Sequence, residues 1–186
     1  MIKFFTNREL SLKLAINLAK WKRWSREFLP PDPLGGMQSG YARQYNSDEA
    51  FTVYLGGLLV SDLKFTIPEA KQILNDLREW LVAKGFYLIA GTGVKEQDVD
   101  KLVNKYIIFI MHNKNLGFYY TIRGIISNNS NEFKGFPVRR EQYTETVLWP
   151  KGNNAENLKT NSINSLNITE IFNDFANELS LSGTFK

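Results

Sequence analysis

The chain has 186 residues, of which 43% are hydrophobic and 13% aromatic, so it can build one large domain or two small ones and is not a wholly disordered protein. It contains no cysteine, which excludes disulfide frameworks, thiolate zinc sites and cysteine redox switches. The net charge is only +4, but residues 1–46 hold eight lysines and arginines against three carboxylates, and the rest of the chain is close to neutral. Such a local basic excess favours a surface that faces a polyanion, although a solvated helix face would look the same.

The N-terminal residues carry charges every few positions and lack the apolar run of a secretory signal peptide. No stretch approaches the ~20 apolar residues that a membrane span needs. We therefore expect a soluble, cytoplasmic protein that does not contact a membrane.

The first elements are two short helices. Thr6 or Asn7 can cap a helix over residues 7–15, and Asn17 can cap a second helix over 18–28. In the second helix the apolar residues share one face and the basic residues occupy much of the remaining surface. Two helices joined by about two residues, the second one basic, are typical of a helix-turn-helix, and Pro30-Pro31 should end the second helix.

Residues 32–40 have the composition of a loop, and residues 41–45 alternate like a short strand. Asn46, with Glu49 three residues later, predicts a capping box and a helix over 47–62. Gly56-Gly57 weaken this helix, and they either permit a close helix contact or mark a break. Thr66 predicts the start of a further helix that runs to about residue 84 and ends at a glycine.

The sequence pattern changes at residue 85, from mainly helical to mainly strand-forming. Beyond it the patterns predict strands at 86–90, 106–111, 118–127 and 142–149, and a charged helix or turn at 95–105. Residues 128–136 are polar and asparagine-rich, residues 150–167 are predicted to form a long loop, and a final amphipathic helix is predicted at 168–179. We therefore expect an α+β fold with a mostly helical domain over 1–85 and an α+β domain with a small antiparallel sheet over 86–186.

Four segments of the front half occur in the order and spacing of a known family: Phe5–Leu10, Trp21–Pro31, Arg43–Ala50 and Leu63–Leu74. Over about residues 4–74 the chain resembles the MerR-type winged helix-turn-helix DNA-binding family. The resemblance implies a recognition helix in the major groove, a wing on the DNA backbone and a homodimer that regulates transcription. The chain departs from the family pattern at Lys22, where arginine is usual, and in the loop over 32–42, which differs from the usual wing.

A winged helix-turn-helix would contact double-stranded DNA through side chains on the second helix and the wing. We expect donors from the helix, a phosphate or minor-groove contact from Arg43, and a hydroxyl contact from Tyr41 or Tyr45, although Tyr45 could equally pack against the third helix. Backbone N–H groups near Thr6 and Asn7 could hold a phosphate. The helix residues expected at the DNA are Lys20, Lys22, Arg23, Ser25 and Arg26. Trp21 and Trp24 are expected to be core supports.

The function that follows is a sequence-specific transcriptional regulator, with residues 86–186 serving dimerisation or binding a protein or small-molecule effector. The alternative is an excisionase-like or architectural DNA-binding adaptor whose back half docks a protein. A weaker option is an enzyme with a site in the back half. Because His112 is the only histidine and no catalytic constellation is visible, we expect no enzyme activity, no metal and no cofactor.

Overall fold

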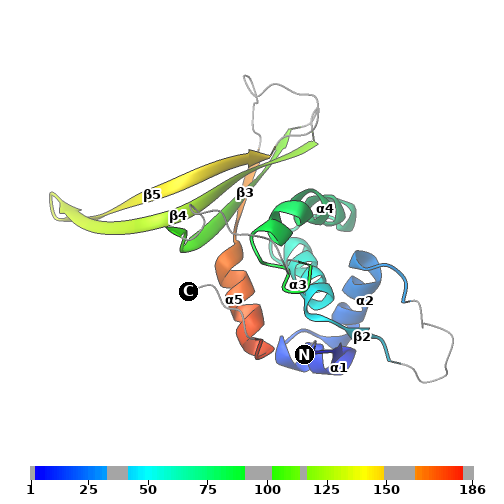
Figure 1. Cartoon of the computed structure of the whole chain (residues 1–186). Helices are drawn as coiled ribbons and strands as arrows, with labels where there is room; N and C mark the ends of the chain where they lie inside the picture. Colours follow the sequence, from blue (N-terminus) through cyan, green and yellow to red (C-terminus); the bar gives the residue numbers. More distant parts are fainter. Residues whose placement is uncertain (1–2, 33–41, 91–101, 114–116, 149–161, 182–186) are drawn as a thin grey trace. The chain divides into compact units, whose positions relative to one another are not determined.

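The computed structural model describes residues 3–32, 42–90, 102–113, 117–148 and 162–181 (Figure 1). Within these ranges it is a mixed α+β protein with five helices and two antiparallel sheets. The helices are α1 (Asn7–Lys13), α2 (Leu18–Phe28), α3 (Ser47–Ser61), α4 (Ile67–Ala83) and α5 (Ile168–Glu178). The strands are β1 (Phe5–Thr6), β2 (Gln44–Tyr45), β3 (Lys105–Asn113), β4 (Gly117–Phe133), β5 (Phe136–Leu148) and β6 (Ser162–Asn167).

The chain divides into two compact units. The first comprises Met1–Lys95 with Asp174–Thr184, and the second comprises Glu96–Asn173 with Phe185–Lys186. The division therefore differs from the boundary predicted at residue 85. The C-terminal part of α5 belongs to the first unit because Phe175, 1% exposed, packs its ring 5.1 Å from that of Phe51 and 5.4 Å from that of Tyr54.

The helix starts of the first unit are the ones that the sequence predicts. Thr6, Asn46 and Thr66 each form a capping box with the glutamate three residues later, and the Asn17 side chain accepts from the backbone of α2. These caps satisfy backbone donors that would otherwise lack a partner, so each helix begins at a defined residue.

Gly56 and Gly57 permit a close contact between α2 and α3. α3 is continuous across both glycines. A Cβ atom at Gly56 would lie 2.7 Å from the Phe28 ring, and one at Gly57 would lie 2.3 Å from the Trp24 ring. From the sequence, these glycines could mark either a break in the helix or a close helix contact, and the structure shows the close contact.

Residues 86–90 are not a strand, contrary to the sequence pattern. Phe86 and Tyr87 are buried, which explains the apolar composition, but the following backbone N–H groups of Ile89 and Ala90 donate to the carboxylate of Asp48. A side chain 41 residues earlier thus takes the place of a strand partner.

The second unit contains a four-stranded antiparallel sheet with strand order β5-β4-β3-β6. Alternate residues of β3 are buried, including Tyr106, Ile108 and Ile110. The strand predicted at 118–127 is longer, because β4 continues through the asparagine-rich stretch to Phe133. The long loop predicted at 150–167 is wrong for residues 162–167, which form β6. The predicted charged helix at 95–105 lies mainly outside the described residues.

β4 and β5 form a long hairpin, in which Phe133 pairs with Phe136 (Figure 1). The two turn residues, Lys134 and Gly135, have φ angles of 51° and 79°, as in the turns that match the twist of a hairpin. Backbone pairing along the whole hairpin, which side-chain hydrophobicity does not reveal, explains why the polar stretch is extended.

Candidate nucleic-acid interface

α2 has a buried aromatic face and an exposed basic face. Trp21 is fully buried, and Trp24 is 9% exposed, so both tryptophans are core residues as expected. The exposed surface of the helix carries four cationic side chains: Lys20, Lys22, Arg23 and Arg26. The helix therefore presents cations outward from a rigid support.

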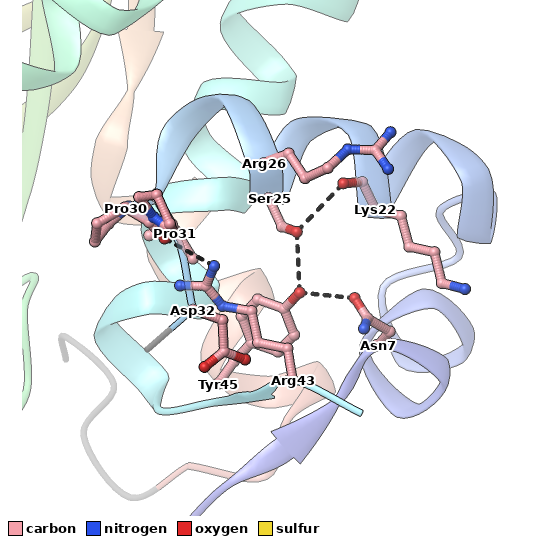
Figure 2. Close-up of a pocket in the computed structure, with 10 residues that line it drawn as sticks. Asn7, Lys22, Ser25, Arg26, Pro30, Pro31, Asp32, Arg43 and Tyr45 are labelled. Atoms are coloured by element: carbon pink, nitrogen blue, oxygen red, sulfur yellow. Dashed lines mark hydrogen bonds between the residues drawn. The ribbon is translucent and has the colours of Figure 1, made fainter. Parts of the chain in front are cut away.

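Tyr45, from β2, contacts both α1 and α2 through its hydroxyl (Figure 2). Its ring is 1% exposed and meets the Trp21 ring edge-on, with 5.8 Å between centroids. Its hydroxyl lies 2.7 Å from Asn7 Oδ1 and 2.9 Å from Ser25 Oγ. Burial raises the pKa of Tyr45, so the phenol stays neutral and can keep donating in this network.

Two residues expected at DNA are thus used inside the domain. Ser25 is 4% exposed and its Oγ also donates to the Lys22 carbonyl. Together with the burial of Tyr45, this leaves neither hydroxyl at the surface. Tyr41, the other hydroxyl named from the sequence, lies outside the described residues.

Thr6 and Asn7 are also engaged. The Thr6 hydroxyl accepts from the Glu9 N–H, while Glu9 Oε2 accepts from the Thr6 N–H at 2.7 Å. The backbone donation from Thr6 is the largest cause of the lowered pKa of Glu9, which therefore keeps a negative charge at this helix end. Because the Glu9 carboxylate occupies the Thr6 N–H, a phosphate would have to displace Glu9 to reach that donor.

Arg43 ties β2 to the end of α2 and the start of α3. Its Nη1 donates to the Pro30 carbonyl at 2.9 Å, and its Nη2 lies 3.5 Å from Glu49 Oε1. The guanidinium carbon is 5.3 Å from the Tyr45 ring centroid, and the side chain is 15% exposed. These contacts make Arg43 a positioning residue at the edge of the basic surface.

The basic face and the loop after α2 enclose a pocket of about 420 Å³ (Figure 2). Cationic and apolar side chains share its lining with the carboxylate of Asp32. The lining consists of Asn7, Lys22, Ser25, Arg26, Leu29, Pro30, Pro31, Asp32, Arg43 and Tyr45. Sequence reasoning identified most of these residues singly, but not that they surround one hollow.

Within the described ranges, no three His, Cys, Asp or Glu side chains gather where they could hold a metal ion. Among the described helices, none is long and apolar enough to cross a bilayer. Comparison of the chain with protein-family models, with curated proteins and with solved structures finds no match.

Proposed function

We propose that the first unit binds double-stranded DNA with α2 in the major groove, and that the protein is a sequence-specific transcriptional regulator. The observation that carries the proposal is the two-sided character of α2. Trp21 and Trp24 are packed in the core, whereas Lys20, Lys22, Arg23 and Arg26 are all exposed. The major groove is wide enough for one such helix, and arginine and lysine can donate both to base edges and to phosphates.

The exposed cations of α2 are not neutralised by the acidic residue of the same helix. The acidic residue of the helix, Glu27, is paired with Lys71 of α4 at 2.9 Å. The hydrogen bond from Lys71 lowers the pKa of Glu27, so this pair remains charged and internally compensated. The cations of the exposed face therefore keep their net positive field.

Of the described residues expected at DNA, only the exposed cations of α2 contact it, and others position the helix. Lys20, Lys22, Arg23 and Arg26 are the DNA-contacting residues. Arg43 holds the wing strand against the end of α2, and the internal network of Tyr45, Asn7 and Ser25 sets the orientation of the helix. The resemblance to the MerR-type family supports the order of these elements.

One such helix reads few base pairs, so specific affinity calls for two half-sites. We therefore expect a homodimer on DNA. Sedimentation should give twice the 21.4 kDa of one chain, and a strict monomer with and without DNA would refute the dimer.

The test of the proposal is selection of bound sequences from random double-stranded DNA, followed by affinity measurements over a range of salt concentrations. The variant Lys22→Ala/Arg23→Ala should bind the selected site more weakly, and its salt slope should fall by roughly two. A matched control, Lys13→Ala/Lys64→Ala, removes two exposed lysines elsewhere in the first unit and should keep the wild-type slope.

Equal binding by wild type and Lys22→Ala/Arg23→Ala would refute the proposed surface. Selection of one inverted repeat would support a regulator, and binding without sequence preference would refute it in favour of an architectural role.

A further inference from the structure

Two adjoining pockets lie elsewhere in the first unit, between the end of α2, the face of α4 and the segment after α4. Their volumes are about 260 Å³ and 300 Å³. Leu29, Thr52, Arg78 and Tyr87 line both, so the two hollows meet along these side chains. Their size suits a small organic molecule.

The walls of this double pocket are held by specific hydrogen bonds. The Tyr87 hydroxyl lies 3.1 Å from Thr52 Oγ1, and the Tyr87 side chain is buried. The Asp48 carboxylate accepts from the N–H groups of Ile89 at 3.1 Å and Ala90 at 2.9 Å, which fixes the segment after α4. The pocket is therefore preformed, and an occupant would not have to order its walls.

Arg78 supplies a cation at the junction of the two hollows. Its guanidinium carbon is 5.4 Å from the Tyr87 ring centroid, and among the described residues no carboxylate lies within ion-pair distance of it. The other cation of the lining, Lys71, is paired with Glu27. The lining also contains the carboxylates of Asp48 and Glu49, which are engaged with the N–H groups of Ile89 and Ala90 and with Arg43. Asn75 lines the same wall three residues before Arg78, on the same face of α4. A planar guanidinium backed by an aromatic ring, next to an amide, matches the geometry of a carboxylate or phosphate group.

We propose that this double pocket is a binding site for a small organic anion. Arg78 and Asn75 bind its carboxylate or phosphate group, and its apolar part packs against Leu29 and Tyr87. The inference does not depend on DNA binding, because it concerns a different surface of the first unit. The double pocket nevertheless adjoins the basic face of α2. Leu29 and Pro30 also line the pocket beside that face, and the Pro30 carbonyl accepts the hydrogen bond from Arg43.

The test is an NMR titration of the full-length, isotope-labelled protein with benzoate and, separately, with phenyl phosphate. We expect saturable shifts of the Arg78 Nε–H, the Asn75 side-chain amide and the Leu29 methyl groups with at least one probe. Whichever probe binds more tightly identifies the preferred anionic group. Benzyl alcohol, the neutral analogue of benzoate, should not saturate the site.

Arg78→Gln should weaken binding about ten- to a hundredfold, as expected for loss of hydrogen bonds to a charged group, while Arg78→Lys should weaken it less. The matched control Arg8→Gln, at an exposed position of α1 that lines neither hollow, should bind the probe like wild type. The proposal is overturned by absence of saturable shifts with both probes, by equal affinity of Arg78→Gln and wild type, or by equal binding of benzyl alcohol. The last comparison needs only the wild-type protein, so it holds even where Arg78→Gln fails to fold.

Discussion

Arg43 donates a 2.9 Å hydrogen bond to the carbonyl oxygen of Pro30, the residue that follows the C-cap of α2. The same guanidinium lies 3.5 Å from Glu49, at the start of α3. One side chain thus fixes the exit of the basic helix relative to the strand and helix that follow. Replacing a residue that positions the helix and replacing one that contacts a phosphate should change the salt dependence of DNA binding differently.

Replacing Arg43 by alanine should weaken DNA binding while leaving the salt slope close to that of wild type, because the lost contacts are internal. Lys22→Ala is the comparison, since it should weaken binding and lower the slope by about one. Affinities measured at several salt concentrations separate the two roles. A slope reduced equally in both variants would assign Arg43 to a phosphate instead.

The Tyr45 hydroxyl should contribute measurably to stability. Tyr45→Phe leaves Asn7 and Ser25 without this buried partner, and we expect a loss of about 1–2 kcal/mol in the free energy of unfolding. Urea denaturation followed by tryptophan fluorescence provides the measurement. Tyr143→Phe, at a residue that is 46% exposed, is the control and should be nearly neutral. An equally small loss in both would show that the network adds little.

The parts of the first unit that the sequence predicts well are those with local causes. Thr6, Asn46 and Thr66 cap their helices through a glutamate three residues later, and the burial of Trp21 and Trp24 follows from spacing along a single helix. Helix starts and faces depend on neighbouring residues, so a pattern within about one turn suffices to predict them.

The parts that the sequence does not predict depend on distant partners. Asp48 determines the course of residues 86–90 from 41 positions away, and Tyr45 meets Asn7 across 38 positions. In the same way, Asn128 and its neighbours are extended because they pair with β5, although asparagine does not favour strands. At the candidate interface, spacing identifies the cations of α2, but it cannot tell that the hydroxyls of Ser25 and Tyr45 face each other inside the domain.

Gly57→Ala should destabilise the first unit even though alanine favours helices. The propensity gain is about 1 kcal/mol, whereas overpacking typically costs about 1–3 kcal/mol. The added Cβ would lie 2.3 Å from Trp24, a rigid ring that is 9% exposed, so we expect the clash to outweigh the gain. Gln72→Ala, at an exposed position of α4, is the control and should change the unfolding free energy by no more than about 0.5 kcal/mol. Increased stability of Gly57→Ala would mean that α2 and α3 separate easily.

Stability should depend on pH through Glu9. The Thr6 hydrogen bonds lower the pKa of Glu9 in the folded state below its ordinary value of 4.5. A lowered folded-state pKa stabilises the protein at pH values above the ordinary one, and the contribution is lost as the pH falls through the lowered value. The stability difference between wild type and Glu9→Gln should therefore shrink on acidification, as measured by urea denaturation at a series of pH values. A difference that is constant from neutral to acidic pH would contradict the capping-box contribution.

The C-terminal part of α5 should be needed for the stability of the first unit. Phe175 is 1% exposed, and its ring packs 5.1 Å from Phe51 and 5.4 Å from Tyr54. Phe175→Ala should lower the unfolding free energy by about 3–5 kcal/mol, the range for removing a buried aromatic ring. Denaturation followed by tryptophan fluorescence reports mainly on this unit, which holds Trp21, Trp24 and Trp80 of the four tryptophans.

Asn177→Ala, at an exposed position of the same helix, is the matched control and should be nearly neutral. A fragment that ends at residue 95 tests the same point without a substitution. It should unfold at a lower urea concentration than the full chain, and a peptide of residues 168–184 should raise its midpoint, because that peptide restores Phe175 to its place beside Phe51. A tryptophan transition that is the same in Phe175→Ala and wild type would place the stability of the first unit entirely in its N-terminal residues.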